Sequence, residues 1–209
     1  MFPLISRKVM QGWVPAWLPA GNSRLLHRVV GCLLCLALLS TLSPEVRAQT
    51  GNEYQVKAAF LYNFAKFVDW PAEAFAGSNG KFVIGVIGDD PFGGSLDQAI
   101  NGKAINGRPL VVRRLKWNQD LRSCHIIFIS SSERQRLKQI IESLRGASVL
   151  TVGDMGHFTQ QGGIINFILE ANKVRFEINS RGADQARLKV SSKLLSLAKN
   201  RQESGSFRE

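Results

Sequence analysis

Residues 162–179, GGIINFILEANKVRFEIN, carry the pattern from which the fold of this chain can be worked out. Apolar and polar side chains alternate along the segment on both sides of an expected two-residue turn at Asn172-Lys173. Such alternation predicts an antiparallel hairpin with one buried face and one face in water. The buried face is expected to carry Phe167, Leu169, Ala171, Val174, Phe176 and Ile178. We expect this hairpin to close one edge of a larger sheet.

The wet face of the predicted hairpin carries two carboxylates and one guanidinium group. In the expected register Glu170 lies opposite Arg175, and Glu177 projects from the same face. A guanidinium between two carboxylates keeps both ionised, whereas an acid–base pair needs two carboxyl groups with different pKa values. The face therefore fits either a salt-bridged sheet edge or a contact surface for a partner or ligand.

Four short apolar runs precede the hairpin, at residues 81–88, 110–115, 125–130 and 148–153. Helical patterns at residues 91–100 and 133–144 separate them, with Asp90 as an expected N-cap and Ser132 with Gln135 as a capping box. Apolar strands that alternate with helices indicate a mostly parallel sheet that is covered on both faces. The predicted fold class is therefore α/β, a three-layer sandwich with a mostly parallel sheet and an antiparallel edge hairpin.

Two longer helices are predicted near the ends of the domain. Residues 53–70 have apolar side chains at helical spacing and further aromatic residues on a second face, which indicates packing on both sides. Residues 183–200 carry an apolar stripe beside a basic face, and we expect that stripe to pack on the sheet. The polar residues 201–209 are predicted to form a disordered tail.

The first 48 residues have the order of a secretory signal peptide. Arg24, His27 and Arg28 precede an apolar run at residues 29–39, and Val46 and Ala48 place small or modest side chains at the two positions that a signal peptidase reads. An uncleaved membrane anchor is the alternative, but a spanning helix needs roughly 17 to 25 residues, which is longer than this run. We therefore expect cleavage after Ala48, localisation in the periplasm, and one folded domain at residues 49–200.

Charge and cysteine content narrow the function further. The chain has 27 Lys and Arg residues, of which five fall before residue 49, and 16 Asp and Glu residues, of which one does. The predicted mature segment therefore has a net charge near +7. In the periplasm such a charge fits an acidic protein surface, an anionic lipid or simply a solvated basic surface, rather than nucleic acid. Cys124 is the one cysteine after Ala48, so an internal disulfide is excluded.

The sequence offers no recognisable catalytic or metal-binding motif. The turn GDDPFGG at residues 88–94 lacks the Gly-Lys-Ser/Thr ending of a phosphate loop, and Asp89 and Asp90 would repel an anion. Cys124 and His125 are neighbours in an expected strand, so their side chains point to opposite faces and cannot form a dyad. His125 and His157 lack metal-ligand spacing. We predict a protein that is not an enzyme and needs no cofactor or metal.

Several ordered blocks resemble the YfiR family of periplasmic proteins. They are YQVKAAFLYNFAKF (54–67) followed by Trp70-Pro71, GDDPF (88–92), GGIINF (162–167), VRFEIN (174–179) and SSKLL (191–195). The resemblance covers nearly all of the predicted mature chain. It implies an α/β sandwich, often dimeric, that binds the periplasmic sensor part of an inner-membrane diguanylate cyclase and represses it, which lowers cyclic di-GMP.

The resemblance also implies how repression is relieved, often through an OmpA-like lipoprotein in the same system. We predict that Phe158, in a glycine-rich loop, and Glu170, Arg175 and Glu177 form the partner-binding patch, because an exposed aromatic side chain beside charged groups is typical of an interaction hot spot. Two other classes remain as alternatives: a periplasmic small-molecule sensor or binding protein, and an enzyme of unfamiliar type.

Overall fold

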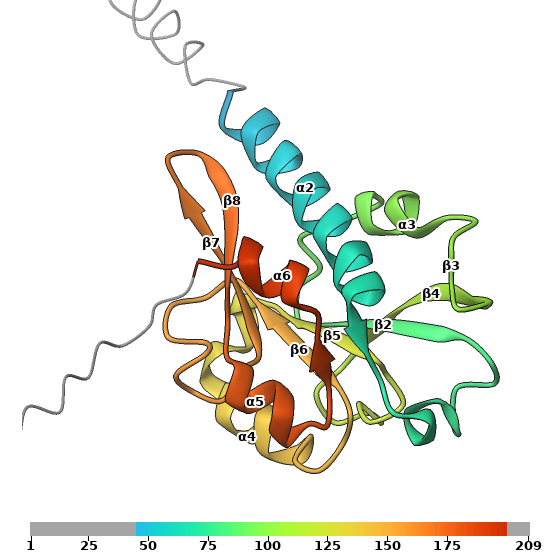
Figure 1. Cartoon of the computed structure of the whole chain (residues 1–209). Helices are drawn as coiled ribbons and strands as arrows, with labels where there is room; N and C mark the ends of the chain where they lie inside the picture. Colours follow the sequence, from blue (N-terminus) through green and yellow to red (C-terminus); the bar gives the residue numbers. More distant parts are fainter. Residues whose placement is uncertain (1–44, 200–209) are drawn as a thin grey trace, which may run out of the picture. The chain divides into compact units, whose positions relative to one another are not determined.

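The computed structural model describes residues 45–199, with side chains from Gly51 onward (Figure 1). Residues 1–44 of the predicted signal peptide and the predicted tail at 201–209 lie outside this part of the chain. Among the helices that the structure describes, none combines the length and the apolar character needed to cross a membrane.

A seven-stranded sheet forms the centre of the fold, in the order β3-β4-β2-β5-β6-β7-β8. The five strands from β4 to β7 in this order run parallel, and β3 and β8 are antiparallel to their neighbours. The strands are β2 (Phe82–Ile87), β3 (Ala104–Ile105), β4 (Arg108–Leu115), β5 (Ile126–Ile129), β6 (Leu150–Gly153), β7 (Ile165–Glu170) and β8 (Lys173–Ile178). The predicted mostly parallel sheet with an antiparallel edge hairpin is confirmed.

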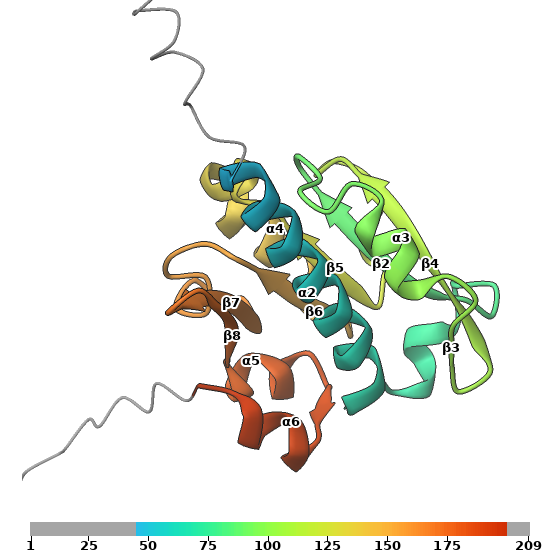
Figure 2. The same ribbon diagram turned by 90° about the horizontal axis from the view of Figure 1, so that it is seen from above.

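Helices cover both faces of the sheet, which gives the predicted three layers. On one face lie α2 (Glu45–Phe67), α3 (Ser95–Ile100) and α6 (Ser192–Leu197), and Figure 2 shows α3 alongside α2. On the other face α4 (Leu137–Ser143) packs through Leu137, Ile140 and Leu144. The central strands β2, β5 and β6 are buried along their whole length because both layers cover them.

The predicted single helix at 183–200 is wrong. The chain instead forms α5 (Ser180–Gln185), the short strand β9 (Lys189–Val190) and α6. Arg187 adopts a left-handed backbone conformation with φ of 58°, which ends α5, and Val190 then pairs with Val68 of β1 (Val68–Asp69). Asn179 and Ser191 accept hydrogen bonds from the backbone N–H groups of the two helix starts. Tertiary strand pairing thus overrides the amphipathic helical pattern.

The predicted helix starts are also corrected. Asp90 does not cap α3, because its carboxylate accepts a hydrogen bond from the N–H of Phe92 and pairs with Arg114, and α3 begins only at Ser95. The predicted capping box at Ser132 is replaced by a 3₁₀ helix, η2 (Ser131–Arg136), which Ser130 caps. A further 3₁₀ turn, η1 (Ala72–Phe75), joins β1 to β2.

Aromatic side chains attach α2 to the sheet. Phe60 and Phe64 pack against Phe167 and Phe176 of the hairpin, with ring centroids between 5.2 and 6.0 Å apart. On another side of the helix Tyr54 meets Phe92 edge-on at 5.4 Å. The predicted core role of the α2 aromatics, with packing on more than one side, is confirmed.

A buried ion pair also joins α2 to the sheet. The Lys57 Nζ atom lies 2.7 Å from Asp154 Oδ2 and 2.6 Å from Glu53 Oε1. The Lys57 and Asp154 side chains are 5% and 8% exposed, so water screens this pair little. Tyr54 donates its hydroxyl proton to the same Asp154 oxygen, and burial together with that carboxylate raises the pKa of Tyr54. The loop after β6 is therefore fixed to the helix by two contacts on one carboxylate.

His125 is a fully buried core residue at the start of β5. Its ring stacks between Phe75 and Phe82, at 4.5 and 4.7 Å, and Nδ1 accepts a hydrogen bond from the N–H of Val83. Because Nδ1 accepts, the neutral ring carries its proton on Nε2, which has no hydrogen-bond partner among the described residues. Burial and, secondly, the nearby Arg108 guanidinium lower the pKa of His125 to about 4.

Replacing Lys57 by Met should lower the free energy of unfolding by about 3 kcal/mol, because Asp154 then remains buried without a counter-charge. Urea denaturation measures the change. The matched variant Lys66→Met, on an exposed position of the same helix, should shift the free energy by at most about 0.5 kcal/mol. Adding Asp154→Asn to Lys57→Met should recover part of the loss; equal stability of Lys57→Met and Lys66→Met would contradict the assignment.

The stability of the protein should fall between pH 6.5 and pH 4. In the unfolded chain His125 takes up a proton near pH 6.5, whereas the folded state resists protonation until about pH 4, so the unfolded state binds more protons in this window. The contribution is complete above pH 6.5 and amounts to roughly 3 kcal/mol. Urea denaturation across this pH range should show a smaller decline in the free energy of unfolding for His125→Asn, which keeps an acceptor for the N–H of Val83. In the control His157→Asn, at an exposed position, the free energy of unfolding should decline as much as in the wild type.

Candidate partner-binding face

The β7–β8 hairpin turns at Ala171-Asn172, and the predicted turn at Asn172-Lys173 is wrong by one residue. Both turn residues have positive φ, 47° and 59°, which is the geometry of a two-residue turn that matches the strand twist. Glu170 therefore pairs with Lys173, and Arg175 lies opposite Ile168 rather than opposite Glu170. Because the register moves by two residues, the strand side chains keep their predicted faces. The predicted burial of Ala171 and Leu169 is wrong, since Ala171 lies exposed in the turn and Leu169 is 54% exposed near it.

The wet face of the hairpin consists of Asn166, Ile168, Glu170, Lys173, Arg175 and Glu177, and we refer to these six residues as the hairpin face. Glu170, Lys173 and Arg175 are exposed, Ile168 and Glu177 are half-buried, and Asn166 is buried at the base. Arg175 makes no ion pair or side-chain hydrogen bond within the described residues, so its guanidinium is available to a partner. The hairpin face is therefore polar and buried at its base, and charged and exposed to solvent at its outer end.

The base of the hairpin face is held by a short polar network. The Glu177 carboxylate accepts hydrogen bonds from Thr159 Oγ1 at 3.3 Å and from Asn166 Nδ2 at 3.2 Å. Asn166 Oδ1 in turn accepts from the N–H of Met155. These bonds hold the Glu177 carboxylate in one position.

The charged end of the hairpin face is held differently. Glu170 forms an ion pair with Lys199, not with Arg175 as predicted, and the Lys199 ammonium lowers the pKa of Glu170. The backbone N–H of Lys199 also donates to the carbonyl of Phe176, so the chain after α6 runs beside the edge strand β8. Leu169, 54% exposed on the opposite side of the hairpin, and Leu197, 58% exposed on α6, add apolar area outside this face.

Phe158 is not exposed, and this part of the predicted patch is corrected. The ring is fully buried in the α4 layer. It lies so close to Gly153 and Gly163 that a Cβ atom on either glycine would come within 2.6 Å and 2.2 Å of ring atoms. The glycine-rich sequence, which suggested a surface loop, instead makes room for an aromatic anchor. Phe158 thereby fixes the loop at residues 154–163, which we name the brace loop because its Thr159 holds Glu177.

The structure thus brings Glu170, Arg175 and Glu177 together on one face and places Phe158 in the α4 layer, where it anchors the brace loop beside the base of that face. Sequence reasoning missed Thr159 and Lys199. The alternation of the hairpin placed Asn166 on the wet face, but its hydrogen bond to Glu177 was not predicted. Thr159 and Lys199 left no signal in the sequence, because only the tertiary fold brings them to the hairpin.

The groups that could support chemistry lie apart. Cys124 is buried in the α4 layer and burial raises the pKa of its thiol to about 11, whereas His125 stacks on Phe82 in the α2 layer. The prediction that these two side chains point to opposite faces is confirmed. Within residues 45–199, no group of three or more His, Cys, Asp or Glu side chains could hold a metal ion.

Comparison with known proteins matches the chain to a family and to several solved structures. A family model described as YfiR/HmsC-like matches residues 54–199. The crystal structure of a conserved domain protein from Vibrio cholerae O1 biovar El Tor str. N16961 aligns with a TM-score of 0.42 and 14% sequence identity. That alignment covers 56% of this chain and 53%, about half, of the Vibrio chain.

Gly163→Ala should destabilise the protein by about 1 to 3 kcal/mol, because the added methyl group would overlap the Phe158 ring and force it to move. Gly156→Ala is the matched control in the same loop, since no atom lies within 4 Å of its added Cβ. Thermal unfolding measures both. The double variant Gly163→Ala, Phe158→Leu should lose less stability than the sum of the losses in the two single variants. Strict additivity of the two losses would argue against a direct contact.

Proposed function

Since the chain belongs to the YfiR/HmsC-like family, we propose that it is a periplasmic, non-enzymatic regulator of a membrane diguanylate cyclase. In this proposal the signal peptide is removed after Ala48 and residues 49–200 act as one domain. The domain binds the periplasmic sensor part of the cyclase and holds the enzyme inactive, which lowers cyclic di-GMP in the cytoplasm. Release of the domain, in some systems through an OmpA-like lipoprotein, restores synthesis.

The observation that best supports a binding role is the arrangement of the hairpin face. Its backbone is rigid, because the opposite side of the hairpin is packed on α2 through Phe167 and Phe176. Its base is hydrogen-bonded, and its outer end offers the unpaired Arg175 beside Ile168. A preorganised face of this kind limits the entropy that is lost when a partner binds. We therefore assign Arg175, Glu170 and Glu177 to partner contact, and Phe158 to positioning the brace loop.

A small-molecule sensor or binding protein is the second candidate. It is favoured by a groove of about 600 Å³ between α4 and α5, within the size range of ligand sites in proteins. The two roles are compatible, because the groove and the hairpin face are separate surfaces that share the brace loop.

Charge reversal at Arg175 should weaken repression without unfolding the protein. The tagged protein is first used to co-purify its cyclase from membranes, and cyclic di-GMP is then measured in cells that carry the deletion and each variant. Arg175→Glu should bind the cyclase about 5- to 30-fold more weakly and raise cyclic di-GMP, as expected for loss of an interface hot spot. The melting temperature should stay unchanged because the side chain is exposed.

The matched control is Arg134→Glu, which reverses another exposed arginine, on η2. It should repress as the wild type does. If Arg175→Glu also represses normally, the hairpin face is not the contact surface. If deletion of the whole gene leaves cyclic di-GMP unchanged and no cyclase co-purifies, the proposed function itself is wrong.

A further inference from the structure

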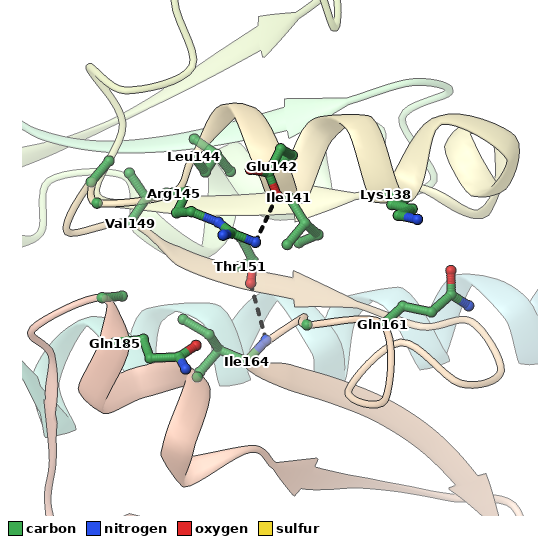
Figure 3. A pocket seen from close by; sticks show the side chains of 15 residues that line it. Lys138, Ile141, Glu142, Leu144, Arg145, Val149, Thr151, Gln161, Ile164 and Gln185 are labelled. Atoms are coloured by element: carbon green, nitrogen blue, oxygen red, sulfur yellow. Dashed lines mark hydrogen bonds and ion pairs between the residues drawn. The ribbon is translucent and has the colours of Figure 1, made fainter.

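The groove between α4 and α5 has the composition of a ligand site (Figure 3). It lies on the α4 face of the sheet, where the turn from α4 enters β6 and where the brace loop enters β7. Its floor is apolar and is formed by Ile141, Leu144, Val149 and Ile164. An apolar floor of this kind favours a ligand with an apolar body, because binding removes that surface from water.

The rim of the groove carries an excess of positive charge. Lys138 has no ion pair or side-chain hydrogen bond to any residue that the structure describes. Arg145 pairs with Glu142, but the two side chains are 79% and 62% exposed, so this ion pair contributes little and Arg145 can turn to a ligand. One carboxylate against two cations leaves a net positive rim, which complements a single negative charge.

The walls are fixed before any ligand arrives. Arg122 donates to the carbonyl oxygens of Ser143 and Arg145, at 3.0 and 2.9 Å, and Arg187 donates to the carbonyl of Gly146 at 3.2 Å. These bonds hold the turn after α4 and bring two further guanidinium groups near the groove. On the opposite wall, Gln161 and Gly162 belong to the brace loop, which Phe158 anchors.

The floor is held as firmly as the walls. Thr151 Oγ1, at the floor, accepts the N–H of Ile164, so the floor strands are joined through a side chain as well as through the sheet. Preformed walls of this kind reduce the cost of binding a small molecule.

We propose that this groove binds a small amphiphile with an apolar body and one carboxylate. The apolar body lies on Ile141, Val149 and Ile164, and the carboxylate meets Lys138, with Gln161 as a neutral hydrogen-bond donor at the same end of the groove. Binding at this site is independent of the hairpin face, so it does not require that the proposed function be correct.

Isothermal titration calorimetry tests the proposal with protein purified from the periplasm of an expressing strain. The probes are decanoate, the uncharged decanol and the cation decyltrimethylammonium. Decanoate should bind at least about tenfold more tightly than either of the others, because only decanoate provides both an apolar body and a negative charge. Equal binding of decanoate and decanol would overturn the assignment of the carboxylate site. Absence of decanoate binding up to about 1 mM, roughly the limit of weak specific association, would overturn the proposal as a whole.

Two variants locate the site. Lys138→Glu should weaken decanoate binding about three- to tenfold, because it removes an exposed attractive charge and adds a repulsive one. Lys116→Glu, an exposed lysine outside the groove, should change it less than twofold, roughly the scatter for remote surface sites. In an NMR titration with decanoate, the backbone amide chemical shifts should change at Gly146 and Gly162, which line the groove, and not at Gly107. An unchanged affinity in Lys138→Glu, or shifts confined to other residues, would overturn the site. Cyclic di-GMP does not enter these measurements, so their failure is distinct from failure of the proposed function.

Discussion

The packing of Phe60 and Phe64 against Phe167 and Phe176 determines which side of the hairpin meets water. Four aromatic rings in mutual contact bury a large apolar area, and side chains alternate strictly along each strand. Once the rings face α2, the charged side chains of β7 and β8 must face the other way. The identity of the hairpin face therefore follows from a contact on its reverse side, and the buried Lys57–Asp154 pair holds α2 in the position that this contact requires.

The brace loop links two surfaces that would otherwise be unrelated. One of its residues, Thr159, holds Glu177 at the base of the hairpin face, and two others, Gln161 and Gly162, line the groove beside α4. Residues 154–163 form no helix or strand, so the position of the loop depends on side-chain contacts: the Phe158 ring between Gly153 and Gly163, and the contacts of Asp154 with α2. Arg175 and Phe158 can thus both affect the hairpin face. Arg175 would act by direct contact with a partner, and Phe158 by holding the brace loop that supports Glu177.

Most of the architecture could be predicted from the sequence, because buried parallel strands and amphipathic helices leave strong local patterns. The faces of the hairpin were predictable for the same reason, but its register was not, since a turn at Ala171-Asn172 needs two residues with positive φ and alanine gives no such signal. The breaks around Arg187 and the burial of Phe158 and His125 depend on partners distant in sequence. Of the candidate site, Glu170, Arg175 and Glu177 were placed on the correct face, and their hydrogen-bond and ion-pair partners were not.

The meeting of the two ends of the described chain has a kinetic consequence. Strand β1 directly after α2 pairs with β9, and α2 also contacts β8 and α6, so segments at opposite ends of the domain complete one core. Contacts of such high sequence separation form slowly, because a long loop must be closed before they are made. Until β7 and β8 are in place, Phe60 and Phe64 lack the rings of Phe167 and Phe176. A newly synthesised chain would thus expose the apolar side chains of α2 until its last strands pair. In this interval the chain is most prone to aggregation and most in need of a chaperone.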